Sequence, residues 1–478
     1  MANTLTKNQV YAICNEIYKQ ATGQQSMRAV DTASFCAMGT TLLACGYDTV
    51  SESISQVLSR TFVDVPMYNR KLRGLKSDSI RFGNMVRRIS IVEKASPFDT
   101  DHRETLTDGQ SVDMFTINKP KAVQVNWYGQ NVYEKSVTIY RDQLDVAFSS
   151  EAEFAKFISG VYRDIQNKIE KVHEEEARAT LSNMIGAKCL SDNENVFYLF
   201  DLYYTETGVS LTKSTYKDPQ YYADFCKWAF GFINSISDIM EEYSNKFHIN
   251  LASGDVVDFT PKTRQKMYLF APEINQISAR IYSSIFSPEF IKYVDFEKVN
   301  FWQNINDPMK IMVKPSYQRK SDGLAVASED SLTVDNIFGV LFDEEACGFT
   351  TINEWSAPTP FNAKGGYQNI FYHFTNRPVC NMFKNFCVFL LDNAPEYDLT
   401  VTKGAHTNIT IKVNGKSITA STTSDAYKLG DTIEISASPA SGYDLTTFTV
   451  NGDDVEGTSI TLQATEDLTI VTAATQQA

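Results

Sequence analysis

The pattern of apolar and polar residues changes character at about Pro395. Before this point, apolar residues recur at helical spacing in some segments and form short continuous runs in others, which predicts helices and buried strands in one mixed body. After it, short alternating runs are separated by turn signals such as Asn414-Gly415 and Asn451-Gly452-Asp453. Alternation with such turns is typical of β-hairpins. The chain is therefore predicted to be α+β, with an autonomous all-β module at residues 396–478.

Helical periodicity is strongest in three parts of the body. Leu5 to Gln20 reads as an amphipathic helix, and residues 31–58 as helical pieces interrupted near Gly39 and Gly46. A longer pattern begins after Ser150, a good N-cap residue, and is predicted to run from Glu151 to Ile185 and to stop at Gly186. At 1.5 Å per residue this helix would be about 50 Å long. Its single apolar stripe predicts packing against one sheet.

Strand-like segments surround the long helix. Residues 81–139 are interpreted as a two-stranded excursion whose apolar content is too low to bury itself, because an isolated hairpin is marginal in water. Residues 216–243 are predicted to be helical, and residues 316–330 to be a polar loop. Buried strands are expected at residues 337–343 and 379–391, and an aromatic-rich strand at 367–375. A loop is expected at 358–366 and a linker at 392–395.

The net charge and the cysteine pattern exclude several classes of function. The net charge of −14 argues against general binding of nucleic acid or anionic membranes. Residues 396–478 hold eleven acidic residues and four lysines, a net charge of −7, so the module is the acidic part. The eight cysteines form no Cys-x-x-Cys pair, which favours reduced core thiols. No apolar run reaches transmembrane length, and residues 1–7 lack the apolar core of a signal peptide.

Catalytic and metal-binding motifs are missing from the sequence. The segment His173-Glu174-Glu175-Glu176-Ala177 begins like a zinc-protease motif, but Ala177 stands where the second histidine is required. We expect these charged residues to form a solvent-exposed face of the long helix. The five histidines have no metal spacing, and no phosphate-binding glycine loop or nucleophile elbow is present. We therefore expect no enzyme, no cofactor and no metal.

The order of segments in residues 1–395 resembles the major capsid protein of tailed bacteriophages, which has the Hong Kong 97 fold. The resemblance is carried by the stretches 106–114 and 128–133, similar to the extended loop, by 148–150 leading into the spine helix, and by 364–373 before the last strands. Some short-tailed phages append a bacterial immunoglobulin-like domain at the position of residues 396–478, and the module here looks like that domain.

The resemblance implies a division of the chain into six segments. They are an N-terminal helical arm (1–61), an extended β loop (62–140), the spine helix with the first part of the peripheral domain (141–214), an axial domain (215–329), the second part of the peripheral domain (330–395) and the immunoglobulin-like β domain (396–478).

The resemblance also implies function, partners and location. The subunit would assemble as hexamers and pentamers, in the host cytoplasm, into the icosahedral virion shell around the double-stranded DNA genome. Expected partners are other copies of the chain, scaffolding, portal and head-fibre proteins, and packaged DNA held without sequence specificity, but no membrane. The module would sit outside the shell, as passive decoration or as a weak multivalent binder of surface glycans.

Charged residues of the excursion are the candidate subunit-contact residues. The basic arm at 70–88 and the acidic stretch at 93–113 would meet opposite charges on adjacent subunits, and the candidates are Arg70, Arg73, Arg81, Arg87, Arg88, Asp99, Asp101, Glu104 and Asp108. Two other interpretations of the arm stay open: a solvated charged loop, and non-specific contact with genome phosphates.

Two functions of other classes remain as alternatives to the shell subunit. One is a bacterial surface adhesin that displays the β module, although the sequence lacks the expected export signal. The other is an enzyme with a carbohydrate-binding tail, which would require a pair of carboxylates in a cleft.

Overall fold

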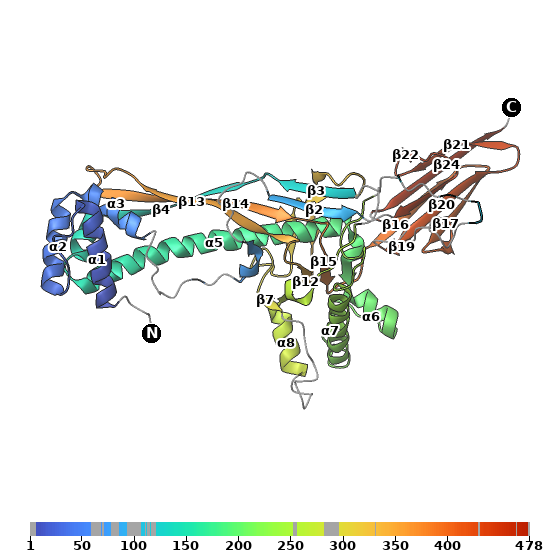
Figure 1. The fold of residues 1–478 in the computed structure, drawn as a ribbon. Coiled ribbons are helices and arrows are strands. Elements are labelled where there is room, and N and C mark those ends of the chain that lie inside the picture. The colour runs from blue at the N-terminus through green and yellow to red at the C-terminus, as the bar shows by residue number, and fades with distance from the viewer. Residues whose placement is uncertain are drawn as a thin grey trace.

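The computed structural model describes residues 6–58, 68, 71–77, 86–92, 107–109, 111, 115, 121–251, 256–281, 296–329, 331–428, 431–464 and 466–476. The body is elongated, with a cluster of helices at one end and the long helix α5 running along it (Figure 1). An all-β module lies beyond the other end of the body. Within the described residues, no helix is long and apolar enough to cross a membrane.

The N-terminal cluster consists of helices α1 (Lys7–Thr22), α2 (Thr32–Ala44) and α3 (Tyr47–Leu58). The predicted apolar face of α1 is confirmed, since Val10, Ile13 and Ile17 are buried. The predicted interruption at Gly39 is wrong, because α2 continues through this residue. A Cβ atom there would lie 2.9 Å from the Phe148 ring, so the glycine allows close packing and does not break the helix.

The spine of the body is the 41-residue helix α5 (Glu151–Ser191). Its N-cap Ser150 accepts a hydrogen bond from the Glu153 backbone N–H at 3.3 Å, as the sequence predicted. The predicted end at Gly186 is wrong, and the helix is about 60 Å long. A Cβ atom at Gly186 would lie 2.6 Å from Val313 Cγ2, so this glycine also marks a close contact with a neighbouring strand.

The surroundings of α5 change along its length. In the first half, Ile165, Ile169 and Val172 form one buried stripe against Phe374 of the adjoining sheet, as predicted, whereas Val161 is only half-buried. In the second half, the side chains Ala177, Leu181, Met184 and Ile185 enter the central core cluster. Strands of several sheets cover this half, and the start of the helix packs into the N-terminal helical cluster, so the expectation of packing against one sheet is correct only between Ile165 and Val172.

A four-stranded sheet lies along the spine in the order β1-β13-β14-β4. Its strands are β1 (Lys76–Ser77), β13 (Cys347–Pro358), β14 (Tyr367–Cys380) and β4 (Asn131–Tyr140). Strand β1 is parallel to β13 and the other pairs are antiparallel. The sequence interpretation placed residues 131–139 in the excursion. This was wrong, because β4 pairs along its whole length with β14.

A five-stranded sheet in the order β5-β15-β12-β6-β7 forms the centre of the body. Its strands are β5 (Val196–Tyr198), β15 (Phe386–Leu390), β12 (Ile337–Asp343), β6 (Gln265–Phe270) and β7 (Glu297–Val299). Strand β12 has the predicted bounds, and all seven of its residues are buried. Side chains on one face of this sheet belong to the central core cluster. Side chains on the other face pack against α6 (Leu199–Thr207), α7 (Tyr222–Ile239) and α8 (Ala271–Ile281).

Short elements complete the body. Two small antiparallel pairs are β8 (Ile311–Val313) with β11 (Leu332–Val334) and β9 (Ser316–Gln318) with β10 (Ala325–Ala327). The second pair corrects the prediction of a loop over residues 316–330. The remaining helices are α4 (Arg141–Ala147) and the 3-10 turns η1 (Arg73–Leu75), η2 (Asn193–Asn195) and η3 (Lys262–Arg264).

The C-terminal module consists of two sheets, ordered β19-β16-β24-β21-β22 and β18-β17-β20-β23. Its strands are β16 (Glu396–Lys403), β17 (Thr407–Val413), β18 (Lys416–Ile418), β19 (Thr423–Lys428), β20 (Thr432–Pro439), β21 (Tyr443–Val450), β22 (Asp453–Asp454), β23 (Ser459–Gln463) and β24 (Leu468–Gln476). The module has its own core cluster, and its all-β character is confirmed. Near the linker, Lys428 forms an ion pair with Asp201 of the body at 2.8 Å.

Candidate subunit-contact site

The described part of the excursion is a two-stranded hairpin of β2 (Val86–Val92) and β3 (Lys121–Trp127). The strands pair with each other from Val86–Trp127 to Val92–Lys121, in a sheet of two strands. Val125 packs against the central cluster, but Ile89 on β2 is 61% exposed. A hairpin of this size does not stabilise itself, and it presents apolar surface to its surroundings.

An ion-pair cluster connects the base of the hairpin to the body. Arg88 Nη1 lies 2.8 Å from Glu345 Oε1, and Arg264 lies 3.3 Å from the same carboxylate and 2.9 Å from Asp343. Burial alone would raise the pKa of Glu345, but Arg88 and Arg264 outweigh this effect and hold it below its usual value. Arg88 is therefore paired within its own chain, a role that the sequence interpretation did not predict.

The three other candidates that the structure describes lie on different elements. Arg87 is exposed on β2, Arg73 is exposed in η1, and Asp108 is exposed in a turn. Arg70, Arg81, Asp99, Asp101 and Glu104 lie outside the described residues. Of the nine candidates, Arg87 is the described residue that combines strong exposure with a place on the hairpin itself.

The four-stranded sheet has an exposed aromatic face that sequence reasoning missed. His373 of β14 and Trp355 of β13 are register partners, with rings stacked at 4.1 Å between centroids, and Trp355 is 51% exposed. Their neighbour Phe374 is buried against α5, so the alternation of a strand places His373 on the opposite face. The aromatic run 367–375 was the available signal, but it predicted only a strand.

Most of the charged segment 173–176 of α5 is buried, with Glu175 as the exposed exception, which contradicts the expectation of a solvated face. The His173 ring packs between Phe349 and Phe374 at centroid distances of 5.6 and 5.4 Å. Glu174 pairs with Arg178 and accepts a hydrogen bond from Tyr68, whose pKa is raised to about 12 by burial and by this carboxylate. The segment is a structural network.

A second buried carboxylate has a similar role. Glu176 accepts hydrogen bonds from Tyr133 and from Asn131 Nδ2, the latter at 2.8 Å. Both partners lie on β4, so this carboxylate connects the spine helix to the sheet. Among the described residues, no group of three histidine, cysteine or acidic side chains is arranged to hold a metal ion.

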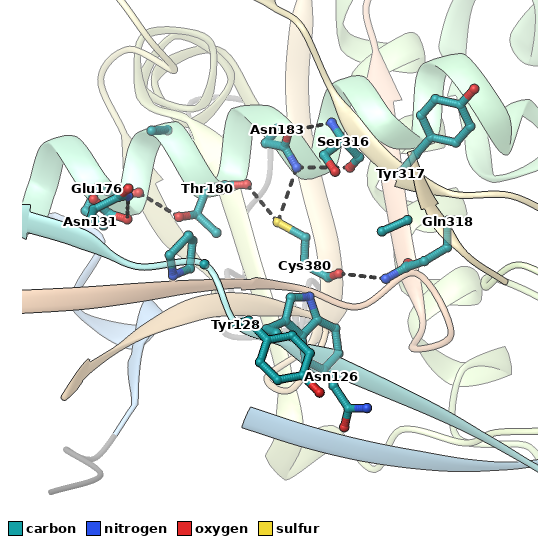
Figure 2. A pocket seen from close by; sticks show the side chains of 15 residues that line it. Asn126, Tyr128, Asn131, Glu176, Thr180, Asn183, Ser316, Tyr317, Gln318 and Cys380 are labelled. Atoms are coloured by element: carbon teal, nitrogen blue, oxygen red, sulfur yellow. Dashed lines mark hydrogen bonds between the residues drawn. The ribbon is translucent and has the colours of Figure 1, made fainter. Parts of the chain in front are cut away.

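A pocket of about 410 Å³ lies where α5 meets the turn between β3 and β4, the β9–β10 pair and the end of β14 (Figure 2). Asn183 of α5 donates a hydrogen bond to the Ser316 carbonyl at 3.2 Å, and Gln318 donates one to the Cys380 carbonyl at 3.3 Å. The Cys380 thiol also faces α5 in this region. These contacts hold the β9–β10 pair against the spine helix.

The arrangement of an N-terminal helical arm, a two-stranded hairpin, a long spine helix and two sheets defines a tailed-phage capsid subunit with the Hong Kong 97 fold. The family model described as Phi29-like phage major capsid protein matches residues 12–390. The chain belongs to this family and is a major capsid protein of a virion shell. This membership decides between the structural protein and the adhesin alternative. The match ends before the module, whose immunoglobulin-like identity stays a prediction.

Solved phage structures resemble the chain at low sequence identity. The capsid structure of Staphylococcus phage Andhra is 11% identical, with a TM-score of 0.47, over 70% of this chain and 87% of that one. A chain from the structure of the head fiber and inner core protein gp22 of bacteriophage P68 is 12% identical, with a TM-score of 0.45, over 70% and 90%. The capsid structure of cyanophage P-SCSP1u is 8% identical, with a TM-score of 0.36, over 69% and 90%. No curated protein matches the chain.

Proposed function

We propose that the subunit assembles through hexamers and pentamers into a closed icosahedral head that encloses the double-stranded DNA genome. The observation that carries this proposal is the β2–β3 hairpin, which leaves Ile89 61% exposed and has no second sheet of its own chain among the described residues. Contacts with neighbouring subunits would cover this surface. Repeated heterologous contacts that close on themselves make a stable shell even when each contact is weak.

The proposal assigns a separate task to each charged residue of the hairpin. Arg87 contacts an acidic group of an adjacent subunit. The other candidates, Arg70, Arg73, Arg81, Asp99, Asp101, Glu104 and Asp108, are proposed as further, separate contacts with neighbouring subunits. Arg88 holds the hairpin in place through Glu345. Because the hairpin is fixed at its base, its exposed residues meet the neighbour in a defined position.

The proposal extends to the chemistry, partners and organisation of the protein. The subunit catalyses no reaction, assembles in the host cytoplasm, and works with scaffolding, portal and head-fibre proteins and with DNA bound without sequence specificity. The six-segment division, with boundaries at residues 61, 140, 214, 329 and 395, is part of the same proposal, except that β4 (Asn131–Tyr140) belongs to the four-stranded sheet and not to the extended loop. The separate core cluster of the module supports the boundary at residue 395.

Electron microscopy of the purified full-length chain, alone and co-produced with the scaffolding protein of its phage, tests the function. We expect closed shells built from six-fold and five-fold rings. Particles that remain monomers or small open oligomers under every condition would contradict the proposed assembly.

The C-terminal module is proposed to be an appendage on the outside of the shell. Its net charge of −7 would be repelled by packaged nucleic acid. Lys428 of the module forms an ion pair with Asp201 of the body, and the same carboxylate accepts a 2.6 Å hydrogen bond from the Ala394 backbone N–H of the linker. The module has its own core, so the body does not need it for folding.

Truncation after Pro395 is therefore expected to leave shell formation and shell diameter unchanged. The measurement is the size distribution of truncated and full-length shells by electron microscopy and light scattering. The variant Lys428→Ala is the matched control, because it removes the ion pair to Asp201 and keeps the module. Complete loss of shells on truncation, with shells retained in Lys428→Ala, would show that the module itself builds the shell.

A further inference from the structure

Two thiols face each other across strands β13 and β14, next to the pocket of Figure 2. Cys347 begins β13 and Cys380 ends β14, and the two residues are direct register partners in the antiparallel pair. The backbone N–H of Asn381 donates to the Ala346 carbonyl at 2.7 Å. This bond joins the residues just outside the pair, so Cys347 and Cys380 occupy a non-hydrogen-bonded position of the ladder.

The geometry of that position suits a disulfide. Partners at non-hydrogen-bonded sites have Cα atoms about 4.5 Å apart, and their side chains point to the same face. Disulfides span Cα separations of about 4.4–6.8 Å. Both cysteines are free thiols in the structure, and their register places them at a separation of the kind that a disulfide spans.

The two thiols differ in access and in hydrogen bonding. Cys347 is 2% exposed inside the central cluster, whereas Cys380 is partly exposed and lines the pocket of about 410 Å³. The Cys380 sulfur accepts a hydrogen bond from Asn183 Nδ2 at 3.4 Å, and its thiol lies 3.5 Å from the Thr180 carbonyl, as Figure 2 shows. A small molecule in the pocket reaches the sulfur of Cys380 first.

The electrostatics support the same order of reaction. The hydrogen bond from Cys347 lowers the pKa of Cys380, with Asn183 acting in the same direction, and burial raises the pKa of Cys347. Burial also raises the pKa of Cys14 and of Cys189 to about 12. Because the thiolate is the nucleophile, these other buried thiols are protected while Cys380 is activated.

We propose that Cys380 and Cys347 form an oxidation site, at which a small peroxide entering the pocket converts the thiol pair into a cross-strand disulfide. The Cys380 thiolate attacks one oxygen of hydrogen peroxide and the O–O bond breaks. Hydroxide is the leaving group, and Cys380 becomes a sulfenic acid. The Cys347 sulfur then attacks the sulfenic sulfur and releases water. In total two thiols lose two electrons and two protons, and the peroxide becomes two molecules of water.

The disulfide would join strands β13 and β14 of the four-stranded sheet beside the spine helix. Cytoplasmic conditions keep such thiols reduced, and the medium outside a lysed cell permits disulfides. The disulfide between Cys347 and Cys380 would therefore form after the particle leaves the host. This chemistry depends on the fold of the body and not on shell formation, so its absence would leave the proposed function standing.

The test treats the purified full-length chain with hydrogen peroxide, blocks the remaining thiols and maps the peptides by mass spectrometry without reduction. We expect a peptide that links Cys347 to Cys380. It should be lost in Cys347→Ser and in Cys380→Ser, and retained in the control Cys45→Ser, since Cys45 is exposed and distant in the fold. In Cys347→Ser, dimedone should label Cys380 as a sulfenic acid.

Specific results would overturn the proposal. Oxidation of Cys45 without any Cys347–Cys380 peptide would show that the pair is inert, and a link from Cys380 to another cysteine would show that the register pair is not the site. Dimedone labelling of Cys347 in Cys380→Ser at the rate seen for Cys380 would contradict the order of attack. If a serine variant fails to fold, the wild-type peptide map and its reversal by dithiothreitol still decide the question.

Discussion

Replacing Asp192 with alanine is expected to destabilise the body by about 3–5 kcal/mol. Asp192 lies just beyond the end of α5, and its carboxylate is 2.6 Å from Lys188 Nζ. Lys188 is fully buried, with the Phe247 carbonyl 3.3 Å from its ammonium group. Without the carboxylate, a buried positive charge would be left with no opposite charge beside it, which costs far more than the loss of a surface ion pair.

Denaturant unfolding followed by circular dichroism measures this loss. The control Lys156→Ala removes an ion pair with Glu153 in which both side chains are well exposed, so it should cost less than about 1 kcal/mol. The double variant Lys188→Met with Asp192→Asn removes both charges and should recover most of the loss. An Asp192→Ala protein that unfolds at the wild-type denaturant concentration would contradict the role assigned to the pair.

The same pair predicts a pH dependence of stability. Burial alone would raise the pKa of Asp192, but the charge of Lys188 outweighs it and the pKa lies below its usual value. A lowered folded-state pKa contributes stability above the unfolded-state value of about 3.9, and this contribution is lost as the pH falls through the folded-state value. The difference in stability between wild type and Asp192→Ala should therefore be constant from pH 7 to about pH 5 and shrink in stronger acid.

Charge reversal at Arg87 is expected to abolish or strongly reduce shell formation while the subunit stays folded. Arg87 is exposed on β2, so its replacement by glutamate leaves the core of its own chain unchanged. A single exposed ion pair contributes only about 0.2–1 kcal/mol. In a shell the same contact recurs in every subunit, and reversal replaces attraction by repulsion at each copy.

The measurement is the yield of sedimenting shells at low and at high salt. The effect of Arg87→Glu should be largest at low salt, because ions screen exposed charges. Lys416→Glu makes the same change of charge on an exposed residue of the module and should assemble normally. Arg88→Glu is expected to act differently, by releasing the hairpin from Glu345 and making it more sensitive to protease. Wild-type yield for Arg87→Glu at low salt would exclude Arg87 from the contact.

The sequence predicted those elements whose pattern is decided by the segment itself. The period of α1, the continuous apolar run of β12 and the turn-rich alternation of the module all identified the correct structure. Glycine was misleading at Gly39 and Gly186, where it was interpreted as a helix end. In both places a neighbouring side chain lies where a Cβ atom would be, and tertiary packing outweighs the modest helical cost of glycine.

Contacts between distant segments could not be predicted in this way. The burial of Glu174 and Glu176 depends on Tyr68 and Tyr133, which come from other elements, and the local pattern of charges indicated solvent exposure. The pair of Arg88 with Glu345 likewise joins residues that are far apart in the chain. The pairing of Arg88 within its own chain and the exposure of Arg87 could therefore be seen only in three dimensions, and the contact role of Arg87 stays a prediction.

The length of α5 has a mechanical consequence. One end of the helix packs into the helical cluster of the N-terminal arm and the other into the central cluster of the body, so the two are connected by a stiff rod of about 60 Å. A tilt of about one degree at one end displaces the other by about 1 Å, because the rod's length multiplies the angle. If the subunit builds the proposed closed shell, copies in flatter and in more sharply curved positions could share most of their internal packing and differ by a small rotation at one end of this helix.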